Sequence, residues 1–401
     1  MSNTGAFQYW QRTMIHSGAG AILRLPGLFA GLGARRILLL SDAGLKAAGI
    51  VDRVAAVFAS GNCPAGVTLA GSYTEIAPDA DIESIDAAVR FARTVAADAI
   101  LAVGGGSVLD AAKIVKAALA QGVLTVETLV ASPLTMLSWP EVAPSGIAHI
   151  SVPTTAGTGA EVTNGAVVMN KASGAKHLYV APFLESDIAV LDATVTTSLP
   201  PHLTAATGMD ALTHALEIIA LPSANDFALA HAMYAAQLIL KWLPAAVADG
   251  SNIDARMGLL HASTMACNAV QNNFGPAPVH NHSHAIGALY HLHHGAANGV
   301  LLPIVIDALP EFYAPAAPRL AAALGVNASG TAAEVLDRVS TRIRRLMAET
   351  VHPFDFSDRR IPVSDVERAV MAVASDPLAM LYPLPPERIT AILARTFGWA
   401  A

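Results

Sequence analysis

The chain of 401 residues carries no Asp, Glu, Lys or Arg between Arg256 and Asp307, and this feature restricts the possible folds most. Charged side chains are the ones that proteins rarely bury, so a long stretch without them is expected to lie inside. Asn, Gly, Pro and His interrupt the stretch, and no run of about 18 consecutive apolar residues remains to cross a membrane. We therefore predict that it forms the interior of a helical domain around its histidines.

Six of the 14 histidines of the chain lie in the 17-residue segment VHNHSHAIGALYHLHHG, residues 279–295. His280 and His284 are four residues apart, the spacing that puts two side chains on one face of a helix. His280 and His294 are separated by about 21 Å along a straight helix. They could share one ion only if the chain turns back, at Gly287 or in the loop before HHGAANG. The spacing leaves these alternatives open.

A second candidate for metal binding is the motif GMDALTHALE, residues 208–217. Asp210 and His214 are also four residues apart, so a helix presents a carboxylate and an imidazole on the same face, as two-ligand metal motifs do. Such a pair alone is more often a surface or capping contact. Its interpretation depends on whether the histidine-rich segment joins it.

The first half of the chain alternates between strand and helix patterns. The segments RRILLLSDAG, DAILAVGGGS and AHISVPTTAGTG contain predicted strands, and 45–59 and 108–120 are predicted helices. This alternation favours a parallel sheet with helices on both faces. From about Pro200 onward, helical patterns predominate. We predict an α/β domain at residues 1–197 and an all-helical domain at residues 198–401.

A glycine-rich turn follows one of these strands and opens a helix. Glycines let the backbone approach a phosphate, and the free N–H groups of a first helical turn attract anions. Asp110, early in that helix, is a further candidate for cofactor binding. Asp42 follows the strand ILLL, at the edge where open α/β sheets bind ligands. Its carboxylate could accept hydrogen bonds from ribose hydroxyls and repel a 2′-phosphate, which favours NAD over NADP. An ordinary tight turn and an Asx-turn are the alternatives.

The motifs GGGSVLDAAK, PTTAGTGAE, GMDALTHALE and the segment ending in HHGAANGVLLP occur in the order seen in the iron-containing (group III) alcohol dehydrogenase family. The chain resembles that family from about residue 15 to the C-terminus. The resemblance implies a dinucleotide-binding α/β domain, an all-helical metal-binding domain in a dehydroquinate synthase-like architecture, and a cleft between them. It also implies a homodimer and NAD-linked hydride transfer between nicotinamide C4 and an alcohol or carbonyl carbon.

The matching motifs imply site residues as well. The metal ligands are Asp210, His214, His280 and His294, and His284 lies near the substrate as a candidate proton shuttle. The pyrophosphate is held by Gly104, Gly105, Gly106 and Ser107. The cofactor site is further lined by Asp42, Thr154, Thr155, Thr158 and Lys176. The metal implied is Fe(II), although three imidazoles and a carboxylate also accept Zn(II) or another divalent cation.

The sequence departs from the family pattern at several positions. The loop usually reads GTGSE, but Ala160 replaces the serine and lacks its hydroxyl. Pro276 and Pro278 are expected to delay or kink the helix that carries His280. Three histidines are additional: His282, which we expect to face away from His280, and His291 and His293, which are ordinary polar residues or substrate contacts.

Composition limits the other possibilities. A net charge of −7 without a basic patch argues against a nucleic-acid partner. The N-terminus lacks a signal-peptide pattern, and two cysteines make no disulfide framework, so we expect a cytoplasmic protein without a membrane partner. The expected substrate is a small alcohol or aldehyde, selected by divergent segments such as 130–140 and the region around Phe354.

Other functions fit parts of the pattern. A maleylacetate reductase-like enzyme or a hydroxyacid dehydrogenase would share the fold, and a dehydroquinate synthase-like enzyme would bind NAD and zinc for a cyclisation. The intact ligand set and the uncharged stretch count against these. A non-catalytic, histidine-rich metal-binding protein would leave the glycine turn, the threonine loop and Asp42 without a role.

Overall fold

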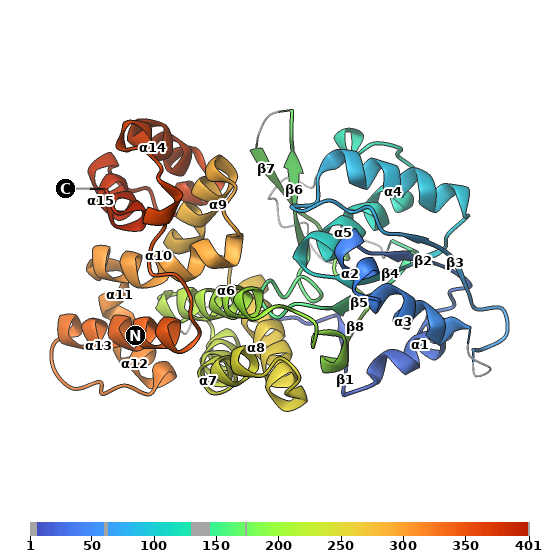
Figure 1. The fold of residues 1–401 in the computed structure, drawn as a ribbon, viewed down its shortest axis with the longest axis horizontal. Helices are drawn as coiled ribbons and strands as arrows, with labels where there is room; N and C mark the ends of the chain where they lie inside the picture. Colours follow the sequence, from blue (N-terminus) through green and yellow to red (C-terminus); the bar gives the residue numbers. More distant parts are fainter. Residues whose placement is uncertain (1–5, 60–62, 130–144, 173–174, 400–401) are drawn as a thin grey trace. The chain divides into compact units, whose positions relative to one another are not determined.

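The structure is a computed structural model that describes residues 6–59, 63–129, 145–172 and 175–399. The chain divides into two compact units, an α/β unit at Gln11–Leu199 and a helical unit that begins at Pro200 (Figure 1). In one respect this differs from the predicted domains, because residues 6–10 belong to the helical unit. There the Tyr9 hydroxyl donates to Asn268 Oδ1 at 2.7 Å, and the Trp10 N–H donates to Asn272 Oδ1 at 2.7 Å.

The α/β unit is built on a six-stranded parallel sheet in the order β1-β8-β5-β4-β2-β3. Its strands are β1 Met14–Ser17, β2 Arg36–Leu40, β3 Thr68–Tyr73, β4 Ala99–Gly104, β5 Ala148–Pro153 and β8 Ile188–Leu191. A separate antiparallel pair is formed by β6 Gly165–Asn170 and β7 Ala175–Val180.

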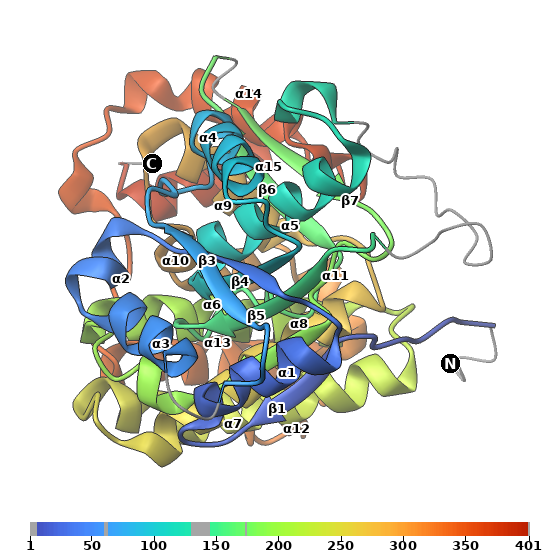
Figure 2. The ribbon, with the colours of Figure 1, turned by 90° about the vertical axis from the view of Figure 1, so that its right-hand side faces the viewer.

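Helices cover both faces of this sheet (Figure 2). One face packs against α1 Leu25–Gly31 and α3 Ile50–Phe58, and the other against α4 Ile82–Thr94 and α5 Gly106–Gln121. Alternate residues of a strand point to opposite faces, so β2 sends Ile37 and Leu39 into the first core and Leu38 and Leu40 into the second. Burial on both faces explains why the central strand β4 and residues 37–40 of β2 are continuous apolar runs.

The predicted helix at residues 45–59 is two helices, α2 Ala43–Ala47 and α3. Gly49, between them, has φ 75°, in the left-handed region that glycine adopts without a steric penalty. The periodicity of the apolar residues continues across this break, so it gave no sign of the turn.

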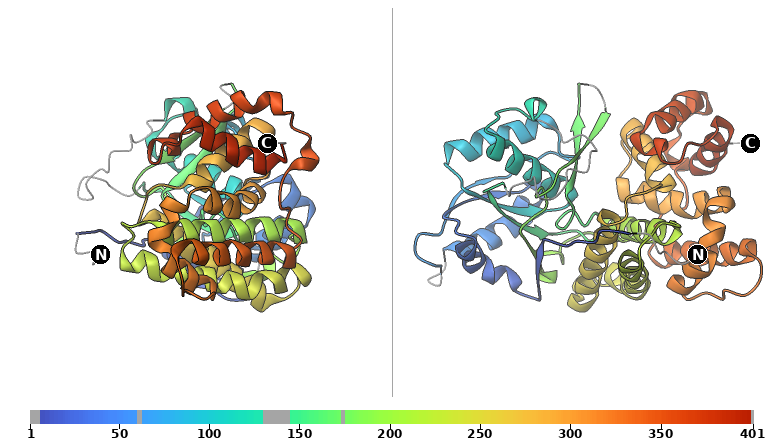
Figure 3. Two further views of the ribbon diagram at one scale, coloured as in Figure 1. Left: turned by 90° about the vertical axis from the view of Figure 1, so that its left-hand side faces the viewer. Right: turned by 180° about the vertical axis from the view of Figure 1, so that it is seen from behind.

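The helical unit consists of helices packed against one another (Figure 3). Its α-helices are α6 Pro201–Ala220, α7 Asp226–Ala248, α8 Ile253–Gln271, α9 Pro278–Tyr290, α10 His294–Ala308, α11 Pro310–Tyr313, α12 Ala317–Leu324, α13 Ala332–Glu349, α14 Val366–Ser375 and α15 Pro386–Phe397.

The uncharged stretch forms most of α8, all of α9 and most of α10. Helix α10 packs against α6, α9 and α13, and its residues from Ala297 to Ile306 are buried, which confirms the predicted interior position. Helix α9 begins at Pro278, so the two prolines delay its start as predicted. Among the described residues, no single helix is long and apolar enough to cross a membrane. The bent pair of helical segments His294–Ala308 and Pro310–Leu324 satisfies the length and composition criteria together.

The α/β unit buries one histidine completely. His149 lies on β5, with its Nε2 3.2 Å from Ser151 Oγ. Burial and the neighbouring charges of Lys116 and Lys113 lower the pKa of His149 well below 6.5. The imidazole is therefore neutral in the folded protein at pH values where the unfolded chain would protonate it.

This difference predicts acid sensitivity that a His149→Gln variant lacks. Below pH 6.5 His149 binds a proton in the unfolded chain but stays neutral in the folded protein. The free energy of unfolding of the wild type therefore falls as the pH falls. We expect the wild-type free energy of unfolding to decrease by up to about 1.4 kcal/mol per pH unit more steeply than that of the variant. Urea unfolding at pH 8, 6.5 and 5.5 measures this, and parallel pH dependences would contradict it.

Candidate metal and cofactor sites

Three helices bring the predicted metal ligands together. Asp210 lies in the middle of α6, His280 near the start of α9, and His294 is the first residue of α10. The reversal between α9 and α10 occurs at His291, which has φ 52° and caps the C-terminal end of α9. Of the two predicted turning points, the loop before HHGAANG is therefore the one that the chain uses.

Close packing of α10 on α6 depends on Gly295. A Cβ atom at this position would lie 2.4 Å from the Ala206 carbonyl oxygen, nearer than real Cβ atoms approach. Because Gly295 follows His294 directly, the missing side chain lets the start of α10 lie against the helix that carries Asp210. The glycine in the motif HHGAANG thus has a packing function at the site.

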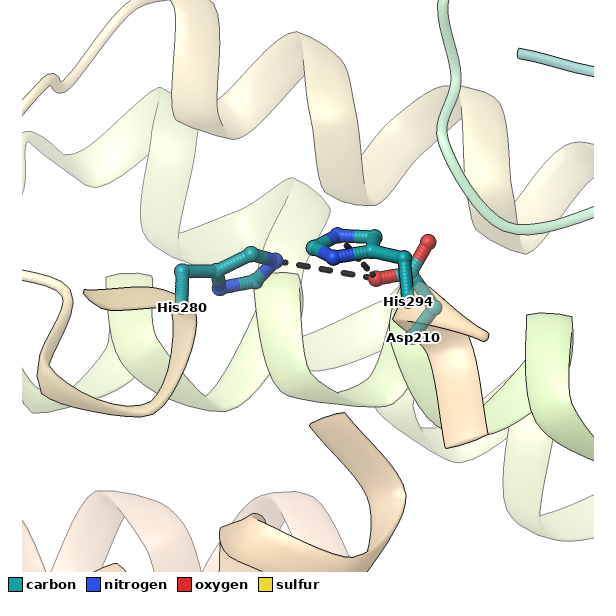
Figure 4. A group of neighbouring side chains, drawn as sticks. All are labelled: Asp210, His280 and His294. Atoms are coloured by element: carbon teal, nitrogen blue, oxygen red, sulfur yellow. Dashed lines mark ion pairs between the residues drawn. The ribbon is translucent and has the colours of Figure 1, made fainter. Parts of the chain in front are cut away.

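The side chains of Asp210, His280 and His294 converge (Figure 4). One ligand atom from each lies within 4.8 Å of the other two. Asp210 Oδ1 is 3.6 Å from His280 Nε2 and 3.5 Å from His294 Nε2. Asp210 is 1% exposed and His280 is 6% exposed, whereas the His294 side chain is 27% exposed, so the group is buried except at His294.

Neighbouring groups determine which ring nitrogens face the centre of this group. His280 Nδ1 lies 2.5 Å from Glu217 Oε2, and His294 Nδ1 lies 3.2 Å from Ser283 Oγ. Partners on Nδ1 leave Nε2 of each ring available, as in carboxylate–histidine–metal arrangements. We assign the Nδ1–H tautomer to both rings on this basis.

His214 lies beside the converging group. Its ring stacks on that of His280, with the ring centroids 4.3 Å apart, and its Nδ1 is 3.9 Å from Asp210 Oδ1. The same nitrogen is 3.5 Å from Cys267 Sγ. The structure therefore places all four predicted ligands together, three with converging donor atoms and the fourth alongside.

The charges in this group compensate one another. Burial alone would raise the pKa of the Asp210 carboxyl, but the imidazoles of His214, His294 and His280 hold it well below its usual range. Burial alone would lower the pKa of His280, but the carboxylates of Glu217 and Asp210 raise it to about 10. Without a cation the carboxylates thus hold a proton on an imidazole, and a divalent ion would compete for the same place.

The donor set fits a divalent ion. Imidazole nitrogens and a carboxylate oxygen are ligands that Fe(II) and Zn(II) accept. The amide nitrogen of Asn298 lies 2.6 Å from Asp210 Oδ1, 3.1 Å from His280 Nε2 and 3.2 Å from His294 Nε2. When both rings are in the neutral Nδ1–H form that metal binding requires, this nitrogen faces three acceptors and has only two hydrogens. The excess of acceptor atoms at one point is what a cation would resolve.

His284 lies next to this group. Its ring centroid is 5.2 Å from that of His294, and its Nδ1 is 3.9 Å from Asp376 Oδ2. Asp376 follows α14, and its other oxygen accepts hydrogen bonds from the Asn281 side chain at 3.2 Å and the Leu378 N–H at 3.0 Å. Burial raises the pKa of the Asp376 carboxyl. A carboxylate distant in the sequence therefore stands beside the predicted proton shuttle.

The additional histidines have structural positions. His282 is completely buried, with Nδ1 2.8 Å from the Pro278 carbonyl oxygen, and it lies outside the converging group. His291 supplies the left-handed turn after α9. His293 caps α10, where its Nδ1 accepts a hydrogen bond from the Ala296 N–H at 3.4 Å.

The glycine turn of the α/β unit joins β4 to α5. Gly105 precedes α5 and offers no side chain to cap it. The threonine loop packs on this turn: a Cβ atom at Gly105 would lie 3.2 Å from Thr155 Cγ2, and one at Gly106 would lie 2.7 Å from Thr158 Cγ2. The glycines therefore let the threonine loop pack closely on the start of α5, which has no side-chain cap. A helix N-terminus that follows a glycine turn is suited to binding a phosphate.

The other residues predicted to line the cofactor site contact neighbouring parts of the α/β unit. The Thr154 N–H donates to the Gly104 carbonyl at 2.9 Å, and Ser107 Oγ accepts from the Asp79 N–H at 3.1 Å. Lys176 Nζ is 2.8 Å from Asp79 Oδ1. Asp42 caps α2, with Oδ1 accepting from the Leu45 N–H at 2.9 Å.

Asp110 is engaged within the α/β unit. Its carboxylate accepts from Lys113 Nζ at 3.1 Å and from the Val167 N–H at 2.9 Å, so it joins α5 to β6. Contact between Asp110 and a cofactor stays a prediction.

Of the segments expected to select the substrate, residues 130–140 lie outside the described residues, and Phe354 is half exposed after α13.

Known proteins resemble this chain over nearly its whole length. Family models described as iron-containing alcohol dehydrogenase and as the C-terminal part of the Fe-containing alcohol dehydrogenase family match residues 12–193 and 204–397. Long-chain-alcohol dehydrogenase 1 of Geobacillus thermodenitrificans (strain NG80-2) is 34% identical over 373 residues, which cover 92% of this chain and 91% of that protein. The chain belongs to the iron-containing alcohol dehydrogenase family.

Other members support the fold. The NAD-dependent methanol dehydrogenase of Bacillus methanolicus is 31% identical over 363 residues, 87% of this chain and 88% of that protein. The crystal structure of a 1,3-propanediol oxidoreductase matches with a TM-score of 0.86 and 29% identity, covering 98% of this chain and 100% of that one. Together with the parallel sheet and the helical unit, these comparisons confirm the predicted fold class.

The packing at the glycine turn of this family member makes Gly106 sensitive to a single methyl group. A Gly106→Ala substitution forces Thr158 to move, and such overpacking costs about 1–3 kcal/mol. We expect a lower thermal midpoint for the variant. Gly27→Ala is the matched control, because Gly27 lies in α1 with nothing within 4 Å of its added Cβ, and alanine favours a helix by up to about 1 kcal/mol. Equal midpoints for the two variants would disprove this account of the turn.

Proposed function

We propose that this protein is a metal-dependent, NAD-linked alcohol dehydrogenase that also reduces the corresponding aldehydes. The observation that carries the proposal is the convergence of Asp210 Oδ1, His280 Nε2 and His294 Nε2 within 4.8 Å in a buried setting. A member of this family with donors for a divalent ion and an uncapped helix N-terminus after a glycine turn has the groups that the reaction requires.

Each predicted ligand has a defined task in this proposal. Asp210, His214, His280 and His294 hold the divalent ion, Fe(II) or another cation such as Zn(II). When bound, the ion supplies a positive charge that favours the alkoxide form of an alcohol, and the nicotinamide supplies the hydride acceptor. The neutral imidazoles and the single carboxylate leave part of the charge of the ion uncompensated.

His284 is the proposed proton acceptor. Its ring lies 5.2 Å from that of His294 by centroid, and a histidine can exchange protons near neutral pH. Asp376, 3.9 Å from His284 Nδ1, would stabilise the imidazolium that forms when the substrate hydroxyl is deprotonated. In the reverse direction, the same pair returns the proton to the carbonyl oxygen during reduction.

The proposed substrate is a small neutral alcohol or aldehyde. A hydroxyacid or maleylacetate carries carboxylates that need cationic partners, and α9 and the first part of α10 contain no Lys or Arg. A purely metal-binding role would leave the glycine turn and its threonine loop unexplained. These considerations favour the dehydrogenase over the alternatives.

The direct test is metal-dependent reduction of NAD. We expect the protein loaded anaerobically with Fe(II), or with Zn(II), to reduce NAD in the presence of primary alcohols or diols. Asp210→Asn should lower kcat/KM by at least about 100-fold, because removing a charged group from a buried set costs about 3–5 kcal/mol. Absorbance at 340 nm and elemental analysis measure the two effects. Wild-type protein that binds a divalent ion and NAD but oxidises no primary alcohol or diol would disprove the proposal.

The preference for NAD depends on Asp42 in this proposal. Asp42→Ser keeps an oxygen to cap α2 but removes the negative charge, so the fold is preserved while repulsion of a 2′-phosphate is lost. We expect the ratio of kcat/KM for NAD to kcat/KM for NADP to fall about tenfold or more, equivalent to about 1.4 kcal/mol. An unchanged ratio in steady-state assays would show that another residue selects the cofactor.

A further inference from the structure

Helix α6 presents a third side chain to the metal site. Glu217 follows Asp210 by seven residues and His214 by three, so all three side chains lie on one face of the helix. Glu217 is buried, at 4% exposure. A carboxylate is costly to bury unless its oxygens are hydrogen-bonded, so its partners identify its task.

One oxygen of Glu217 orients a predicted ligand. Glu217 Oε2 lies 2.5 Å from His280 Nδ1. An ionised carboxylate only accepts hydrogen bonds, so Nδ1 must carry a hydrogen and donate it. The lone pair of the neutral ring is then on Nε2, which lies 3.6 Å from Asp210 Oδ1.

The other oxygen caps the helix that carries His280. The residue before α9, Ala277, has only a methyl side chain, which cannot accept a hydrogen bond from the start of the helix. Pro278, the first helical residue, has no N–H. The first free donor of the helix is the Val279 N–H, which donates to Glu217 Oε1 at 2.7 Å. Glu217 therefore satisfies a group that helix starts leave without an intrahelical partner.

We propose that Glu217 is a positioning residue of the metal site, which fixes the His280 ring and the start of α9 together through its two oxygens. The inference rests on the proposed function, because it concerns the ion that His280 would hold. Ser283, which contacts His294 Nδ1 at 3.2 Å, lies one turn further along α9. Holding α9 in place thus orients two of the predicted ligands.

The Glu217→Gln substitution separates this role from simple burial. Glutamine has nearly the same shape, but its amide has one acceptor oxygen and one donor NH₂ group. It can accept from His280 Nδ1 or from the Val279 N–H, and the NH₂ group then faces the other donor. Glu217→Asp keeps two acceptor oxygens on a shorter side chain and should restore part of the function.

The experiment uses Co(II) as the probe, because its visible absorption reports ligand geometry. We expect Glu217→Gln to bind Co(II) about 10–100-fold more weakly than the wild type, the usual effect of losing an outer partner of a ligand histidine. Its Co(II) spectrum should also change, and amide hydrogen exchange at the start of α9 should accelerate. Glu185→Gln is the matched control: Glu185 is a buried carboxylate of the α/β unit, and Co(II) binding should not change.

Each outcome supports or overturns the proposed positioning role of Glu217. A Glu217→Gln protein with wild-type Co(II) affinity and spectrum overturns the proposal while leaving the proposed function intact, even if its thermal midpoint falls. If Glu217→Gln does not fold, Glu217→Asp decides: weaker Co(II) binding with an altered spectrum supports the proposal, and unchanged binding overturns it. Wild-type protein that binds no Co(II), Fe(II) or Zn(II) overturns the metal-dependent function and this inference with it.

Discussion

The helical unit depends on a buried negative charge. Asp210 is nearly inaccessible to water, and an unpaired carboxylate in that position would cost several kcal/mol. The imidazoles of His280, His294 and His214 compensate it, and they come from α9, α10 and α6 itself. The requirement to neutralise one carboxylate therefore sets where three helices must meet. Gly295 lets the start of α10 lie against α6, and Glu217 contacts Nδ1 of the His280 ring.

In the α/β unit, the feature suited to binding an anion is made of backbone groups at the start of α5. The start of α5 has no side-chain cap, and Gly105 and Gly106 let the threonine loop pack closely against it. A helix N-terminus of this kind attracts an anion through its N–H groups and its dipole. One unit thus carries a concentrated set of cation ligands, and the other carries a site suited to phosphate. A reaction between a metal-activated alcohol and a dinucleotide requires both.

Much of this arrangement follows from local sequence patterns. The strands β2 and β4 were predictable because burial on both faces makes them almost wholly apolar, whereas β5 contains His149 and Ser151 and was recognised from the Thr/Gly loop that follows it. Strand β3, Thr68–Tyr73, contains Thr, Gly and Ser at the sheet edge and has no such pattern. Asp210 and His214 follow from helical spacing, and the same spacing extended by three residues would have found Glu217. The turn at His291 and the contact of Asp376 with His284 have no local signal, since a left-handed histidine and a contact between α9 and the end of α14 depend on tertiary packing.

The uncharged stretch explains why these distant contacts matter. Helix α9 and the start of α10 carry histidines but no carboxylate, so the acidic partners of those histidines come from outside the stretch. Glu217 and Asp210 approach from α6 and act on the ligand His280, whereas Asp376 approaches from the end of α14 and faces His284. The acidic neighbours of the predicted ligand His280 and of the proposed shuttle His284 therefore come from different parts of the helical unit. Asp376 also accepts a hydrogen bond from the Asn281 side chain at 3.2 Å, so the end of α14 is tied to the helix that carries both His280 and His284.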